Sequence, residues 1–158
     1  MGFVYAPSVR TLVAHEVEFV VVGGMAALLQ GAPVNTLDLD VVYDRAPGNV
    51  RRVLSALTEL DAIFREDPQR LRPNELHLAS TGHKLLETNR GPLDLLGTIE
   101  ENTGFDELIA DSEWLAIGEL RVRVLSLARL IRLKEKLTRP KDKAMLLILR
   151  ATLDEKQR

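Results

Sequence analysis

The stretch that decides the fold begins Phe19-Val20-Val21-Val22-Gly23-Gly24 and, after 13 further residues, continues Asp38-Leu39-Asp40-Val41-Val42-Tyr43. Each apolar run has the length and the β-branched content of a buried strand. Side chains alternate along a strand, so the two aspartates are expected on one side of it, about 6.6 Å apart at about 3.3 Å per residue. Two carboxylates so placed repel each other, and a hard cation between them removes that cost. The alternative is that Asp38 and Asp40 simply face solvent from a half-buried strand.

The glycine pair Gly23-Gly24 closes the first of these strands. Glycines there offer backbone N–H groups and close approach, which predicts a phosphate-binding turn. The pair is not a dinucleotide fingerprint, because the third glycine and the downstream acidic ribose ligand are missing. No serine of the chain lies in a Gly-x-Ser-x-Gly motif, which argues against a serine hydrolase. Thr36 is predicted to cap or hydrogen-bond the motif loop rather than to touch a substrate.

A third aspartate, Asp94, lies in the apolar run Pro92-Leu93-Asp94-Leu95-Leu96. A buried carboxylate without a partner costs several kcal/mol or becomes protonated, so Asp94 is expected to need a cation. As a third metal ligand it would also orient or deprotonate an acceptor hydroxyl. The alternative is again a side chain that faces solvent.

Lys134 is the basic residue with the most informative position. On a helix that begins near Leu127, it falls on the apolar side. Three interpretations stay open: contact with a triphosphate or a site carboxylate, an internal ion pair with Asp142 or Glu135, or snorkelling along its own stem.

Other basic residues of the C-terminal part carry weaker signals. Lys141 lies in the first turn of a final helix, where the dipole disfavours a cation, so a nearby anion or simple exposure would explain it. A solvated helix face is predicted for Arg129, Arg132 and Lys136. The three histidines lack metal-ligand spacing.

Taken together, Gly23-Gly24, Thr36, Asp38-x-Asp40 and Asp94 resemble the nucleotidyltransferase superfamily, whose members share the polymerase-beta palm. The closing stretch, residues 124–142, is similar to the small bacterial branch that includes AbiEii-type toxins and minimal nucleotidyltransferases. The likeness covers nearly the whole chain. Such enzymes often have a serine after the first motif glycine; Gly24 stands there in this chain, so backbone donors would serve alone.

The resemblance implies a palm with C-terminal helices, two Mg²⁺ ions, and transfer of a nucleoside monophosphate from an NTP to a hydroxyl. It implies that Asp38, Asp40 and Asp94 act as metal ligands and catalytic residues. Gly23, Gly24, Lys134 and Lys141 would bind the nucleotide. The acceptor would be tRNA or another RNA, a protein, or a small molecule. Two alternatives remain: a toxin-antitoxin component that acts mainly by binding an antitoxin-type partner, and a palm-fold protein that binds nucleotide without turnover.

Length and composition set the broad class. A chain of 158 residues is expected to form one domain with a self-sufficient core, spanning residues 1–158. The absence of cysteine excludes disulfides, zinc-thiolate sites and a cysteine nucleophile, and fits a reducing cytoplasm. No signal-like N-terminus and no apolar stretch of membrane-spanning length is present, so we expect a cytoplasmic protein without a membrane partner.

The net charge of −2 hides an asymmetry along the chain. Residues 1–118 carry 9 basic and 18 acidic side chains, a net charge of −9, and residues 119–158 carry 12 basic and 5 acidic, a net charge of +7. An acidic catalytic core and a basic C-terminal hairpin with helices would suit a site for Mg²⁺ and a polyanion. Two oppositely charged surfaces that attract each other explain the pattern equally well.

The order of patterns predicts an α/β (α+β) fold, a mixed sheet of about five to seven strands flanked by helices. Strands are predicted at 18–22, 37–43, 62–65, 76–79, 84–88, 93–96, 114–117 and 120–125. Helices are predicted at 7–16, 25–30, from 47 onward, 126–137 and from 140 onward.

Overall fold

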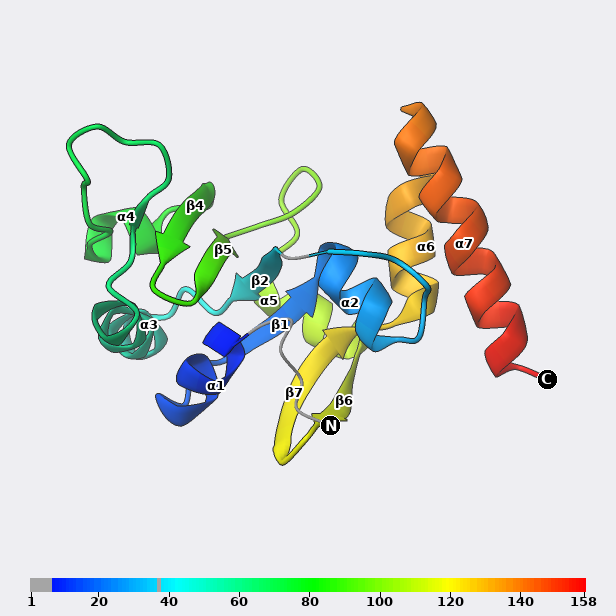
Figure 1. Cartoon of the computed structure of the whole chain (residues 1–158), viewed down its shortest axis with the longest axis horizontal. Helices are drawn as coiled ribbons and strands as arrows, with labels where there is room; N and C mark the ends of the chain where they lie inside the picture. The colour runs from blue at the N-terminus through cyan, green and yellow to red at the C-terminus, as the bar shows by residue number, and fades with distance from the viewer. Residues whose placement is uncertain (1–6, 37) are drawn as a thin grey trace.

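The computed structural model describes residues 7–36 and 38–158. Its centre is a mixed sheet of seven strands in the order β3-β4-β5-β2-β1-β7-β6 (Figure 1). The pairs β1–β7 and β2–β5 are parallel and the other four are antiparallel. The strands are β1 (Phe19–Val22), β2 (Leu39–Tyr43), β3 (Ile63–Phe64), β4 (His83–Thr88), β5 (Gly91–Leu96), β6 (Ser112–Ile117) and β7 (Leu120–Leu125). The predicted mixed α/β sheet is confirmed.

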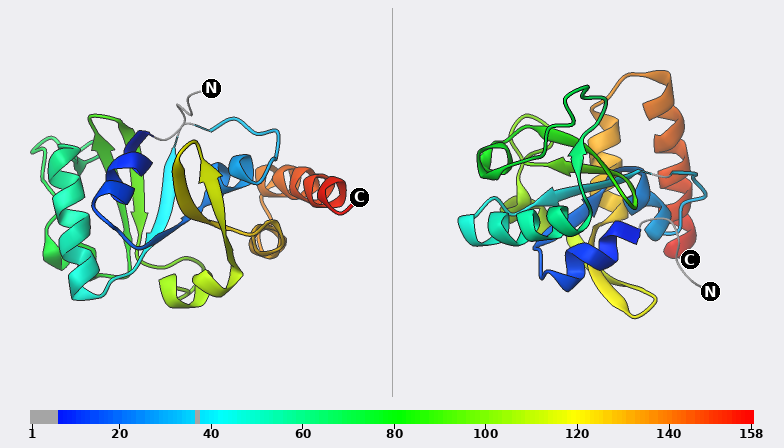
Figure 2. Two further views of the ribbon diagram at one scale, coloured as in Figure 1. Left: turned by 90° about the horizontal axis from the view of Figure 1, so that it is seen from below. Right: turned by 60° about the vertical axis from the view of Figure 1, so that its left-hand side comes forward.

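Helices α3 and α4 lie at one end of this sheet, and α6 and α7 lie at the other (Figures 1 and 2). Helix α3 contacts both α1 and α4, while α6 contacts both α2 and α7. The helices are α1 (Pro7–Ala14), α2 (Gly23–Leu29), α3 (Pro47–Glu59), α4 (Glu75–Ala79), α5 (Phe105–Leu108), the 3₁₀ helix η1 (Ile109–Asp111), α6 (Leu127–Glu135) and α7 (Pro140–Lys156). Ser126 caps α6 by accepting a hydrogen bond from the backbone N–H of Arg129, and Pro140 occupies the first turn of α7.

The two central strands are almost entirely buried. All four residues of β1 are buried, and in β2 every residue except Asp40 is buried. A run of valines favours this position because β-branched side chains pack well on a pleated surface covered on both sides. Asp40 is therefore a carboxylate placed at the centre of an apolar sheet.

The second predicted strand is shorter in the structure than in the sequence pattern. It begins at Leu39, so Asp38 lies just before the strand and is exposed. The prediction also included Leu37, which lies outside the described residues.

The strand predicted at residues 76–79 is wrong, because this segment is helix α4. Asn74 caps it: its side chain accepts a hydrogen bond from the backbone N–H of His77 at 2.9 Å, and the His77 ring accepts one from the backbone N–H of Asn74 at 3.0 Å. This reciprocal cap outweighs the β pattern of a short apolar run. Leu76 is 83% exposed, which a central strand would not allow. The short helices α5 and η1 were not predicted.

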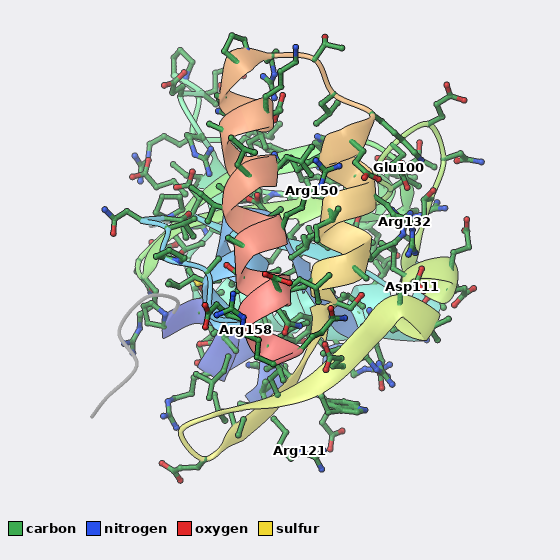
Figure 3. The ribbon with its side chains drawn as sticks, turned by 90° about the vertical axis from the view of Figure 1, so that its right-hand side faces the viewer. Glu100, Asp111, Arg121, Arg132, Arg150 and Arg158 are labelled. Atoms are coloured by element: carbon green, nitrogen blue, oxygen red, sulfur yellow. The ribbon has the colours of Figure 1, made fainter. Side chains whose placement is uncertain are left out.

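The solvated face predicted for α6 is wrong at Arg129. Its side chain is only 10% exposed and forms ion pairs with Glu100 and Asp111, whereas Arg132 and Lys136 are more than half exposed. Hydrogen bonds from Lys136 and then Arg129 lower the pKa of Glu100 to about 2. Figure 3 shows Glu100, Asp111 and Arg132 along one flank of α6. These pairs tie α6 to the segment between β5 and β6, which its helical periodicity alone could not indicate.

Candidate active site

Asp40 and Asp94 lie side by side on neighbouring central strands. The register of the parallel pair β2–β5 sets Asp40 opposite Asp94. On the other side of β2, Val22 is opposite Asp40, so the glycine pair that follows Val22 begins beside the same carboxylate. Two of the three predicted carboxylates and the glycine motif are thus brought together by strand pairing.

Gly23 packs directly against the Asp40 side chain. A Cβ atom at position 23 would lie 2.5 Å from Asp40 Oδ2, and the residue has a φ of +68°. Both the left-handed backbone and the contact distance therefore require glycine here. The next residue, Gly24, is set close to Thr36, whose Cβ and Oγ1 would each lie 3.3 Å from a Cβ at position 24.

The Asp40 carboxylate is buried without full compensation. In the described part of the chain, its Oδ1 is the one buried side-chain oxygen or nitrogen that has no hydrogen-bond partner. Burial is the largest cause that raises the pKa of Asp40 to about 7 from the ordinary 3.8; Asp94 and then Asp38 raise it further, and Arg65 opposes the shift. A cation at this oxygen would remove the cost of the buried charge.

Asp94 already has a cationic partner in this structure. Arg65, just after β3, donates from Nη2 to Asp94 Oδ1 at 2.6 Å and to the backbone oxygen of Leu86 at 2.8 Å. The expectation that Asp94 needs a cation is therefore met by an arginine 29 residues earlier in the chain. Sequence reasoning missed Arg65, because only the register of β3, β4 and β5 brings it to Asp94.

Asp38 and Thr36 lie at the entrance to β2. Asp38 is exposed, and its backbone oxygen lies 3.5 Å from Thr36 Oγ1, which donates to it. Thr36 thus hydrogen-bonds within the loop that precedes β2, and its role beside the glycine motif stays a prediction. Across residues 7–36 and 38–158, no three His, Cys, Asp or Glu side chains converge as a ready-made metal site.

A cavity of about 210 Å³ opens beside the glycine motif and Asp40. Gly23, Gly24 and Asp40 form one wall with β1 and β2, and Lys134 of α6 contributes the second charged group. The remaining lining is apolar and comes from β1, α2, β5, the loop after β5, α6, the α6–α7 connection and α7: Val22, Ala27, Leu96, Ile99, Leu130, Leu133, Leu137, Met145 and Leu149. A mainly apolar cavity with a few polar groups at one end is typical of a small-molecule site.

The overall topology has a counterpart among solved structures. No known family model and no curated protein matches the chain. A candidate nucleotidyltransferase of Thermotoga maritima, known from its crystal structure, superposes with a TM-score of 0.58 at 19% sequence identity, over 96% of this chain and 93% of that one. The fold is nucleotidyltransferase-like. At a sequence identity this low, the similarity supports the fold alone. Any inference about the chemistry has to come from the side chains described above.

Within this nucleotidyltransferase-like fold, Lys134 both lines the cavity and forms an ion pair. Its Nζ lies 3.0 Å from Asp142 Oδ1, and Asp142 also accepts from Arg139 Nε at 2.7 Å. The Asp142 side chain has no exposed surface. Hydrogen bonds from Arg139 and then Lys134 hold the pKa of Asp142 below its ordinary value. Of the three interpretations of Lys134, the internal pair with Asp142 is observed, and contact with a triphosphate stays a prediction.

Lys141 is placed differently. It is exposed at the start of α7 and does not belong to the described residues that line the cavity. Its exposure is sufficient to explain a lysine at this helix position.

None of the helices in the described ranges is long and apolar enough to cross a membrane.

Proposed function

We propose that this protein is a Mg²⁺-dependent nucleotidyltransferase of the small bacterial AbiEii-type branch, which moves a nucleoside monophosphate from an NTP to a hydroxyl acceptor. One observation carries the proposal: the Asp40 carboxylate, whose Oδ1 is buried without a partner, lies beside Asp94, against Gly23, at the wall of the cavity. The nucleotidyltransferase-like fold supports it.

The aspartates fit a hard divalent cation. Carboxylate oxygens are the ligands Mg²⁺ prefers, and Asp40 offers one that is buried and unpartnered. Asp38, Asp40 and Asp94 would hold two Mg²⁺ ions, with phosphate oxygens completing the coordination. When bound, the ions would stabilise negative charge on the attacking and leaving oxygens.

The chain's own groups would bind and position the nucleotide. Backbone N–H groups of Gly23 and Gly24 would donate to the triphosphate, and the apolar part of the cavity would take the base. Lys134 would contribute positive charge from the opposite wall, with Lys141 as a more distant candidate. Asp94 would orient the acceptor hydroxyl and take its proton as oxygen bonds to the α phosphorus and pyrophosphate leaves.

We further propose a macromolecular acceptor, tRNA or a protein. All seven strands of the described residues belong to the one sheet that carries Asp40, Asp94 and the glycine pair. A macromolecule would bring its own surface to the site. An antitoxin-type partner protein would be either the acceptor or an inhibitor of the same site.

The test is label transfer. The protein is incubated with Mg²⁺, a cell extract and each NTP labelled at the α phosphate in turn. We expect label on RNA or protein with the parent and none with an Asp38→Asn/Asp40→Asn variant whose melting temperature is at least as high as that of the parent. Transfer by both proteins, or by neither, would refute the assignment.

The Arg65–Asp94 pair favours a second candidate, a protein that binds nucleotide without turnover. If the pair never opens, Asp94 contributes no metal ligand. NTP binding in the absence of any label transfer would support this second function.

A further inference from the structure

Arg65 lies two strands away from the aspartate that it contacts. It follows β3, and its backbone N–H donates to the Leu85 oxygen of β4 at 2.9 Å. Leu85 is in turn opposite Asp94 on β5. The arginine side chain therefore crosses β4 to reach the central strands. Sheet pairing holds both ends of this contact.

The contact is an ion pair that is largely removed from water. The side chains of Arg65 and Asp94 are 27% and 16% exposed, and Nη2 lies 2.6 Å from Asp94 Oδ1. The same Nη2 donates to the Leu86 oxygen at 2.8 Å. The two hydrogen bonds offset the desolvation of this partly buried guanidinium. The ion pair therefore opens less readily than a pair on the surface.

We infer that Arg65 is a resident counterion that occupies Asp94 until a divalent cation and an NTP replace it, an inference that rests on the proposed function. While the pair is closed, Asp94 is held by Arg65 and does not act with Asp38 and Asp40 as a three-carboxylate site. The guanidinium also places a positive charge where a metal ion would bind. Metal binding alone therefore has to displace Arg65.

An NTP changes this balance because it brings its own negative charge. The triphosphate offers the released guanidinium an anionic partner, since planar guanidinium groups suit phosphate oxygens. Opening the pair then costs less when metal and NTP arrive together. Arg65 would thus couple the two ligands and disfavour metal without substrate.

The test compares Mn²⁺ binding, measured by electron paramagnetic resonance without nucleotide, in the parent and in Arg65→Gln. We expect the variant to bind Mn²⁺ about fivefold to tenfold more tightly, the lower part of the usual range for coupled sites. The added effect of an NTP on Mn²⁺ affinity should shrink by a similar factor. Unchanged or weaker Mn²⁺ binding by Arg65→Gln would overturn the counterion role and leave Arg65 as a structural residue.

Two controls isolate the charge of Arg65. Arg72→Gln removes an exposed arginine that pairs with Asp61 at 2.5 Å, and it should leave Mn²⁺ affinity unchanged. Arg65→Lys keeps the positive charge and should stay close to the parent. Tight Mn²⁺ binding by Arg65→Lys would contradict the electrostatic explanation.

A measurement on the parent covers the case in which Arg65→Gln does not fold. Arginine side-chain NMR should show a guanidinium with slowed rotation that becomes mobile or shifts when Mg²⁺ and a non-hydrolysable NTP analogue are added together. Persistence of the closed pair in the ternary complex would refute the inference while leaving nucleotide binding intact. Failure of the parent to bind Mn²⁺ even with NTP would instead remove the proposed function, and this inference with it.

Discussion

At the scale of single residues, Gly23 and Asp40 constrain each other. Gly23 is required by its positive φ and by the 2.5 Å that would separate its Cβ from Asp40 Oδ2. Asp40 is in turn held in an apolar strand with one oxygen unpartnered. Such a locally unfavourable arrangement is expected where function, rather than stability, determines the side chain.

Gly23→Ala is expected to destabilise the fold and to abolish NTP binding. Alanine at a left-handed φ costs about 1–2 kcal/mol, and the new methyl group would also displace the Asp40 carboxylate. Gly118→Ala is a matched control, because Gly118 has a φ of +60° and nothing within 4 Å of a Cβ. Urea unfolding and NTP titration of both variants separate the two effects. Equal losses of stability with NTP binding retained in both would show that the contact with Asp40 is unimportant.

The stability of the metal-free protein should depend on pH through Asp40. Its pKa is raised to about 7 in the folded protein from 3.8. The folded state therefore holds this proton more tightly, and the stabilisation, complete below the unfolded pKa, is lost as the pH rises through the folded one. The free energy of unfolding of Asp40→Asn, relative to that of the parent, should therefore be greater at pH 7.5 than at pH 4, by on the order of 1–3 kcal/mol.

The control for that titration is Asp94→Asn. This change leaves Arg65 without its carboxylate partner, so it should destabilise the metal-free protein at pH 4 and at pH 7.5, by about 1–3 kcal/mol. Thermal melts with a chelator present measure both variants. Loss of stability in Asp40→Asn at both pH values would mean that Asp40 is held by bonds rather than strained by burial.

At the scale of elements, the junction of α6 and α7 forms the far wall of the cavity. Lys134 in the last turn of α6 and Arg139 before α7 share the fully buried carboxylate of Asp142. The two helices run side by side in Figure 3, where Arg150 of α7 lies between them; it pairs with Glu135 at 2.8 Å. Asp142 thus keeps a cationic partner even if Lys134 turns toward a ligand.

Lys134→Met should weaken NTP binding about tenfold while the protein stays folded. Methionine suits the apolar lining, and Arg139 remains on Asp142, so mainly the charge facing the triphosphate is lost. Glu135→Gln, which breaks the exposed pair with Arg150 on the same helix pair, should change neither property. Isothermal titration with NTP and thermal melts give both values. A large fall in melting temperature with NTP affinity unchanged would assign Lys134 to a structural pair only.

At the scale of the whole molecule, the charge asymmetry is partly neutralised inside the chain. Arg123 pairs with Glu18, Arg129 with Glu100 and Asp111, Arg132 with Asp111, and Lys136 with Glu100. The C-terminal part therefore attracts the acidic core, one of the two explanations left open by composition. Lys134 is the basic residue of that part that lines the cavity beside Asp40.

Mg²⁺ and NTP are expected to stabilise the molecule cooperatively. The three aspartates leave a metal ion short of ligands until phosphate oxygens complete its shell. The rise in melting temperature with both ligands should clearly exceed the sum of the two separate rises. Additive shifts, measured by differential scanning fluorimetry, would contradict a shared site.

Much of the fold could be predicted because it depends on local patterns. The valine runs, the glycine punctuation and the cap at Ser126 each specify an element within a few residues, and the mixed sheet follows from their order. The prediction was wrong at residues 76–79, where the cap at Asn74 favours a helix over the predicted strand. It was also wrong at Arg129, whose burial depends on Glu100 and Asp111.

The sequence by itself determined which residues are chemically unusual: two glycines at a strand end, and Asp40 and Asp94 in apolar runs. A charge in an apolar run is recognisable because burial without compensation is costly wherever the strand lies. Only the tertiary structure decided how that cost is met. Strand register sets Asp40 beside Asp94 and brings the Arg65 side chain across β4 to Asp94. The packing of α6 against α7 places Lys134 in an ion pair with Asp142. Those partners are distant in the chain, and no local propensity encodes contacts that arise from the pairing of whole strands and helices.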